Sequence, residues 1–211
     1  MANTHVYSKK EEAANAITHG IGAGLSIAAL VLLIVRASYI GEAWHIVSFV
    51  LFGFFMFILY MSSTLLHSFP EGKVKDLFEI FDHGSIYLFI AGTYTPYLLV
   101  TIRSPLGWSL FGVVWGLAIG GVVFKCFFVK RFLFLSTLGY VIMGWMIVFA
   151  WGALVDHLAY GGLVFLVIGG VCYTVGSVFY VWRGFLYHHA VWHLFVIAGS
   201  ICHFFSIFLY V

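Results

Sequence analysis

Seven apolar runs of similar length constrain this chain more strongly than any other feature of its sequence. Each approaches the roughly 20 consecutive apolar residues that a helix needs to cross the hydrocarbon core of a bilayer. The charged fraction is only 9%, whereas about a quarter of the residues in soluble domains are charged. The sequence therefore predicts an all-α integral membrane protein, a seven-transmembrane helix bundle. Its spans are expected at residues 16–35, 44–66, 80–101, 106–124, 132–151, 159–181 and 188–210.

The connections between the runs are short, so we expect one compact bundle without a separate domain. Residues 1–15 are expected to form a cytoplasmic N-terminal segment, and residues 16–211 a single transmembrane domain. Ser8 and Glu11 have the spacing of a capping box, which predicts a short interfacial helix over residues 9–15.

Lysine and arginine in the loops predict which way round the bundle sits, because cytoplasmic loops carry an excess of them. The side that bears the N-terminus has eight, and the other side has only Arg36 and Arg103. We therefore expect a multi-pass protein of the cell membrane, with the N-terminus in the cytoplasm and the C-terminus outside. The small net charge of +2, without a basic cluster, excludes a nucleic-acid partner. The eight residues are Lys9, Lys10, Lys73, Lys75, Lys125, Lys130, Arg131 and Arg183.

This topology brings four polar residues to one depth. His67 ends the second span at the cytoplasmic side, Asp82 begins the third there, and His189 and His193 begin the seventh. His189 and His193 are spaced i, i+4, so they share a helix face about 6 Å apart. Three histidines with an open fourth position are typical of catalytic zinc, and Asp82 could hold a water there. The alternative is that these histidines sit in the interfacial region, bonded to carbonyls or headgroups.

Several stretches around these residues resemble one known family. The stretch "SSTLLHSF" (62–69) contains an SxxxH pattern, and "EAANAITHG" (12–20) matches E-x-x-N-x-x-T-H. An aspartate opens "FDHGSIYLFIAGTYTPYLL" (81–99), and "HAVWHLFVIAGSICHFF" (189–205) has HxxxH with a further histidine ten residues on. Together they resemble the progestin and adipoQ receptor family, and its bacterial hemolysin III-like branch in particular. The resemblance extends from Glu12 to the C-terminus.

This resemblance implies a zinc ion near the cytoplasmic face of a seven-helix bundle. By motif, the ligands would be His67, His189 and His193, Asp82 would meet the metal through a water, and Ser63 would lie nearby. The wider superfamily includes alkaline ceramidases, which cleave lipid amides. His83 stands where the receptors usually have an aromatic residue, and we expect its side chain to point away from the metal. The long N-terminal domain of the animal receptors is absent, so binding of a protein hormone does not carry over.

The favoured functional hypothesis is an intramembrane zinc hydrolase that acts on a lipid amide or ester and serves membrane lipid homeostasis. Asp82 would act as general base, and Ser63 as a donor to the developing charge. The alternative is a sensor or receptor for a membrane lipid, with a structural zinc. A pore-forming hemolysin is disfavoured, because few charges line the middle of any span.

Four further features have their own expectations. His19 is either a neighbour of the metal site or a packed helix end, and His203 lies about 15 Å beyond His193 along the helix, too far to join the same ion. Pro96 is expected to bend the third span, which could open a lateral path to lipid. The glycine line formed by Gly112, Gly116 and Gly120 is expected to pack within the bundle.

Overall fold

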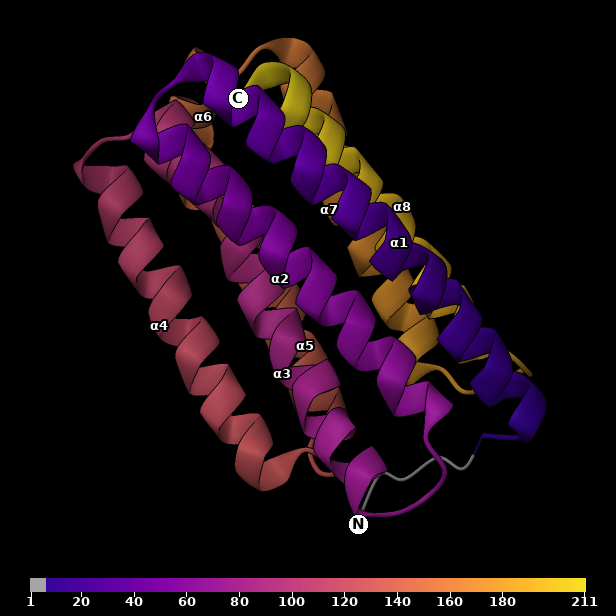
Figure 1. Ribbon diagram of the computed structural model, residues 1–211. Helices are drawn as coiled ribbons and strands as arrows, with labels where there is room; N and C mark the ends of the chain where they lie inside the picture. Colours follow the sequence, from indigo (N-terminus) through magenta and orange to yellow (C-terminus); the bar gives the residue numbers. More distant parts are fainter. Residues whose placement is uncertain (1–6) are drawn as a thin grey trace.

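In the computed structural model, which describes residues 7–211, the chain forms a bundle of helices (Figure 1). Seven helices are long and apolar enough to cross a membrane, so the seven predicted spans are confirmed within the described residues. The elements are α1 Lys9–Ile40, α2 Ala43–Ser68, α3 Lys73–Pro96, η1 Tyr97–Ile102, α4 Pro105–Phe128, α5 Leu133–Trp145, η2 Met146–Ala150, α6 Trp151–His157, α7 Tyr160–Val181 and α8 His188–Tyr210.

The order in which the helices pack determines where the chain's polar ends meet. The first helix, α1, lies along α2 and also contacts α8, which pairs with α7 (Figure 1). On the other side of α2, α3 is followed by α4 at the edge of the bundle. Because the number of spans is odd, the start of α1 and the end of α8 lie at opposite ends. The end of α2 therefore lies beside the starts of α1, α3 and α8.

The first span begins earlier than the apolar run. The capping box is confirmed: the N–H of Ser8 donates to Glu11 Oε2 at 2.9 Å, and Ser8 Oγ accepts from the N–H of Glu11 at 3.3 Å. From Lys9 the helix continues without a break, so residues 9–15 are its first turns rather than a separate helix. No proline interrupts this stretch, and the helix ends only at Gly41, whose positive φ of 78° a glycine adopts without strain.

The third span changes its helical geometry at Pro96. Regular α-helix ends at this residue, and the following turn, η1, is a π-helix. Proline has no N–H to donate and its ring crowds the preceding turn, so the hydrogen-bond ladder must shift there. The hydrogen-bond pattern thus changes at Pro96, and the predicted bend of the third span stays a prediction.

The fifth span is one continuous apolar run in sequence but three pieces in structure. The hydroxyl of Tyr94, on α3, donates towards the carbonyl oxygens of Met143 at 2.9 Å and Gly144 at 2.7 Å, and accepts the N–H of Ile147 at 2.8 Å. A side chain inserted into the ladder in this way interrupts an α-helix. The interruption appears as the 3-10 segment η2 between α5 and α6.

The glycine line of α4 does not pack within the bundle, so that expectation was wrong. A Cβ atom added at Gly112, Gly116 or Gly120 would meet nothing within 4 Å. The helix instead buries the face that carries Leu110 and Val114. Larger apolar side chains gain more contacts than glycines do, which explains why this face turns inward.

We predict that Tyr94→Phe destabilises the bundle, because the buried N–H of Ile147 loses its acceptor. An unsatisfied buried donor costs about 1–3 kcal/mol, so thermal unfolding in detergent should show a clearly lower melting temperature. Tyr39→Phe is the control, since Tyr39 is 88% exposed. Equal melting temperatures for the two variants would contradict the role given to the Tyr94 hydroxyl.

Candidate metal centre

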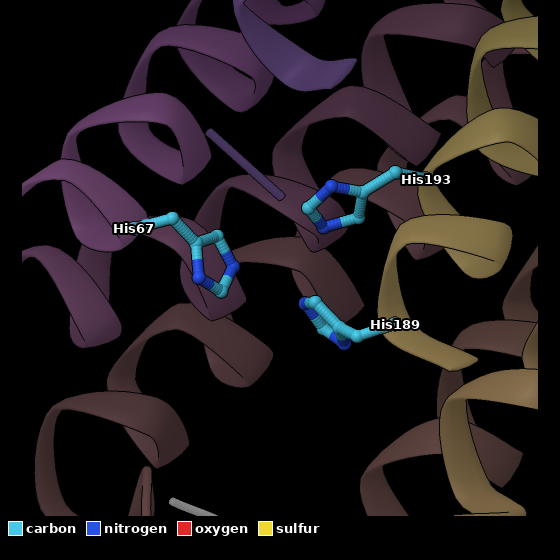
Figure 2. A group of neighbouring side chains, drawn as sticks. All are labelled: His67, His189 and His193. Atoms are coloured by element: carbon cyan, nitrogen blue, oxygen red, sulfur yellow. The ribbon is translucent and has the colours of Figure 1, made fainter. Parts of the chain in front are cut away.

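Three histidines from two helices meet inside the bundle at the end where α1 begins. His67 lies near the end of α2, and His189 and His193 lie on successive turns at the start of α8 (Figure 2). One ring nitrogen of each lies within 4.8 Å of the others, and all three side chains are buried. The structure thus brings together the three residues that the sequence analysis singled out, and the cluster could hold a metal ion.

The protonation of His67 is determined by a carboxylate on α1. Nδ1 of His67 lies 2.6 Å from Glu12 Oε2, and the other oxygen of Glu12 accepts from Lys75 Nζ at 2.5 Å. A carboxylate accepts hydrogen bonds only, so Nδ1 carries the proton and donates it. Nε2 of His67 is buried and has no hydrogen-bond partner among residues 7–211. It is therefore available as a lone-pair donor.

The same helix also orients His193. Nδ1 of His193 lies 3.0 Å from Thr18 Oγ1 and 3.2 Å from the carbonyl oxygen of Asn15. The Thr18 hydroxyl donates its own proton to backbone carbonyl oxygens of α1, at 2.9 Å. It therefore accepts the hydrogen bond from Nδ1 of His193. His19 stacks on His193, with ring centroids 3.4 Å apart and planes 10° apart. Of the two alternatives for His19, a neighbour of the metal site or a packed helix end, the first fits this contact.

The donor set fits zinc. Zinc is commonly held by neutral imidazole nitrogens, and the second nitrogen of such a ligand usually donates to a carboxylate or carbonyl. His67 and His193 have that arrangement, and within the described chain Nδ1 of His189 is buried without a hydrogen-bond partner. An orphaned imidazole nitrogen in a membrane interior is costly unless a further group pairs with it.

Asp82 lies on α3 beside this cluster and is buried. Its carboxylate is 3.6 Å from Nδ1 of His83, and it lines cavities that His189 also lines. His83 itself is engaged elsewhere, since Nε2 lies 2.8 Å from the Tyr180 hydroxyl and Nδ1 lies 2.8 Å from the carbonyl oxygen of Glu79. His83 also lines the polar cavity that His67 and His189 line, so the expectation that it points away from the metal stays a prediction.

Ser63 lies one turn before His67 on α2, and its side chain is buried. Its hydroxyl makes no hydrogen bond to any other described residue, and it lines neither of the two cavities beside the histidines. The role predicted for Ser63 therefore stays a prediction, supported by its position in the chain alone.

An apolar cavity of about 140 Å³ extends from His189 and His193 into the bundle. Side chains of α3, α5, α7 and α8 line it, from Asp82 and His189 to Leu166 at the far end. Val148 and Trp151 also line it and are exposed on the outside of the bundle. The cavity therefore reaches the lipid-facing surface beside the broken fifth span rather than at Pro96.

A second, polar cavity of about 130 Å³ lies at the end of the bundle where α1 begins. It contains ion pairs, among them Lys130 with Asp76 at 2.5 Å, and it meets the apolar cavity at Asp82, Tyr180 and His189. Tyr7 covers the histidines here, with its ring centroid 5.2 Å from that of His189. Burial of the Tyr7 hydroxyl raises its pKa well above the usual value.

Sequence reasoning missed the function of α1 in this site. The stretch EAANAITHG was noticed as a motif, but no role was assigned to Glu12, Asn15 or Thr18. Their spacing was the available signal, because residues at i, i+3 and i+6 or i+7 lie close to one face of a helix. That face carries the groups that contact His67 and His193.

Comparisons with known proteins agree on one family. Residues 7–204 match the family described as Haemolysin-III related. The chain is 54% identical over 202 residues to "Hemolysin-3" of Bacillus cereus, covering 96% of this chain and 92% of the relative. It is 53% identical to the "Hemolysin-3 homolog" of Bacillus subtilis (strain 168) over 205 residues, covering 97% and 96%.

A more distant similarity extends to animals. The "Monocyte to macrophage differentiation factor" of Homo sapiens is 28% identical over 207 residues, covering 95% of this chain and 84% of the relative. No solved structure gave a significant match to the chain.

We predict that Glu12→Gln and Thr18→Val each weaken metal binding at the histidine cluster about tenfold or more, although neither residue is one of the three histidines, because partners of this kind orient the ligating rings. Competition with a fluorescent chelator on purified protein would measure the affinity. Glu71→Gln is the matched control, since Glu71 also pairs with Lys75, at 3.3 Å, but is exposed and makes no contact with the histidines. Affinities equal to that of the control would show that α1 does not orient the site.

Proposed function

The chain belongs to the Haemolysin-III related family, and we propose that it is a zinc-dependent intramembrane hydrolase that cleaves an amide or ester bond of a membrane lipid. The observation that carries the proposal is the position of the histidine cluster, in which His189 and His193 line an apolar cavity that opens towards lipid. By cleaving such lipids, the protein would serve membrane lipid homeostasis.

His67, His189 and His193 would hold the zinc ion. Zinc with three histidine ligands and an open position polarises a carbonyl group and lowers the pKa of water to about 7. Asp82 is the candidate general base, because it is the carboxylate that lines the cavities on both sides of His189. Ser63 is retained as a candidate donor to the developing charge.

The two cavities suit an amphiphilic substrate. The apolar cavity would take an acyl chain, and the polar cavity would take the headgroup. Their shared residues, Asp82, Tyr180 and His189, lie where the bond between the two parts of the lipid would be. A lipid could enter from the bilayer beside Val148 and Trp151.

The orientation with the N-terminus in the cytoplasm is part of the proposal. It rests on a count of lysines and arginines at the helix ends and in the loops: eight lie on the histidine side of the bundle and two on the other side. In this orientation the scissile bond would lie near the headgroups of the cytoplasmic leaflet.

A lipid sensor with a structural metal is the second candidate. It is favoured by the coverage of the cluster, since the Tyr7 ring lies over His67 and His189 and all three ligand side chains are buried. Closed sites are typical of structural zinc. Measurement of hydrolysis separates this candidate from the first.

We predict that purified protein contains about one zinc per chain, in line with a three-histidine site, and that His193→Ala loses most of it. Metal content would be measured by mass spectrometry after removal of loosely bound ions. His157→Ala is the control, because His157 is an exposed histidine at the far end of the bundle. Full retention of zinc by His193→Ala would show that the proposed ligand set is wrong.

We further predict that Asp82→Asn keeps its zinc and its fold but loses lipid hydrolysis. Asparagine has nearly the same shape as aspartate but cannot accept a proton, and loss of a positioned base typically costs about 100-fold or more in rate. The assay would follow fatty-acid release from a panel of membrane lipids.

The zinc-stripped wild type provides the baseline for this assay. If zinc-loaded wild type releases no more fatty acid than this baseline from any lipid of the panel, the hydrolase proposal fails and the sensor becomes the better account. If Asp82→Asn loses zinc together with activity, Asp82 supports the metal site rather than acting as the base.

A further inference from the structure

His203 is a buried imidazole that the proposed chemistry does not use. It lies on α8 about 15 Å beyond His193, estimated from ten residues of helix rise. Its side chain is only 7% exposed, and it lines the apolar cavity that starts at His189 and His193. Nδ1 of His203 has no hydrogen-bond partner in the described part of the chain.

A glycine on the neighbouring helix α7 accommodates the His203 ring. A Cβ atom at Gly169 of α7 would lie 2.7 Å from Nε2 and Cδ2 of His203, so only glycine accommodates the ring there. One turn further along α7, Tyr173 stacks with His203, with ring centroids 5.4 Å apart and planes 15° apart. A leucine or phenylalanine would fill such a place in a membrane core without any polar atom to satisfy.

The neighbouring polar groups are already paired with one another. The Tyr60 hydroxyl donates to Ser200 Oγ at 2.6 Å, Tyr173 lies 3.0 Å from the same oxygen, and Ser200 donates to the carbonyl oxygen of Val196 at 2.9 Å. None of these bonds involves His203, whose ring lines the apolar cavity. Orphaned imidazole nitrogens are costly in hydrocarbon, which is why ionisable residues inside membranes usually mark a functional site.

We propose that His203 hydrogen-bonds a hydroxyl group carried by the distal half of the lipid's acyl chain, so that the preferred substrates are lipids with a chain-hydroxylated fatty acid. This rests on the proposed function, in that an acyl chain occupies the cavity. One leaflet's hydrocarbon is about 15 Å deep, half of the bilayer core, so His203 lies level with the far part of a chain whose carbonyl is at the histidine cluster.

A hydroxyl group fits either form of the neutral ring. Neutral histidine has one donor and one acceptor nitrogen, and a hydroxyl group can both donate and accept. A carbonyl group on the chain would pair only with the donor nitrogen. A plain chain leaves the imidazole unpaired, and this difference provides the selectivity.

The test compares two free fatty acids, stearate and stearate with a hydroxyl group on the distal half of its chain, as competitors of a fluorescent fatty acid bound to the zinc-loaded full chain in detergent. Wild type should bind the hydroxylated acid about five- to tenfold more tightly, the effect of one hydrogen bond to an otherwise unpaired group. His203→Leu should lose this preference, and His203→Gln, which keeps a donor and an acceptor, should retain part of it. His157→Leu, the same change at an exposed site outside the cavity, should behave as wild type.

A stability measurement keeps the inference testable if a variant binds poorly. Without ligand, His203→Leu should unfold at the same or a higher temperature than wild type, because it removes a buried unpaired group. A large loss of stability would instead indicate that His203 is satisfied within the bundle, by an ordered water for example, and would overturn the proposal. Equal binding of the two acids by wild type, or failure of both acids to displace the probe, would overturn it as well.

The binding test is independent of turnover. Preferential binding without any fatty-acid release would support His203 as a recognition residue while the hydrolase proposal fails. Hydrolysis of plain and hydroxylated lipids at equal rates, with equal binding, would leave the hydrolase proposal standing and refute the role of His203.

Discussion

Two hydrogen bonds to α1, from His67 to Glu12 and from His193 to Thr18, hold the bundle together where its polar residues meet. In hydrocarbon, a buried polar group must find its partner within the protein. The helices α2 and α8 are far apart in sequence, and α1 lies between them in space. It joins them because it pairs with one ring nitrogen of His67 on α2 and one of His193 on α8. The same two bonds leave the opposite nitrogens of those rings for a common ligand. The same contacts therefore both pack the bundle and orient the candidate metal site.

Much of the fold follows from the sequence because bilayer thickness imposes a length on every span. That constraint also placed His67, Asp82, His189 and His193 at one depth, and the structure brings the three histidines together. Helices such as α1 extend further than predicted, because the helix continues beyond the apolar run into residues such as Lys9 that reach water. Depth can be predicted from hydropathy, whereas the end of a helix depends on caps.

What the sequence could not provide was the rotation of each helix and the contacts between side chains. The glycine line of α4 has a pattern that suits close packing, yet the adjoining face with Leu110 and Val114 is the one that is buried. Nothing in residues 132–151 signals that their helix is interrupted, because the hydroxyl responsible belongs to Tyr94 on another span. The partners of His67 and His193 were invisible for the same reason, although their motif was evident.

The interruption by Tyr94 has a consequence for the length of the fifth span. Five residues of 3-10 helix rise about 10 Å, whereas five residues of α-helix rise about 7.5 Å. The segment η2 thus lengthens this span by about 2.5 Å without an added residue, and Ile147 and Val148 within it line the apolar cavity. The hydroxyl of Tyr94 thus contacts the segment that both lengthens the span and forms the cavity wall beside Val148, so a change in this segment would alter the span's length and the cavity's wall together.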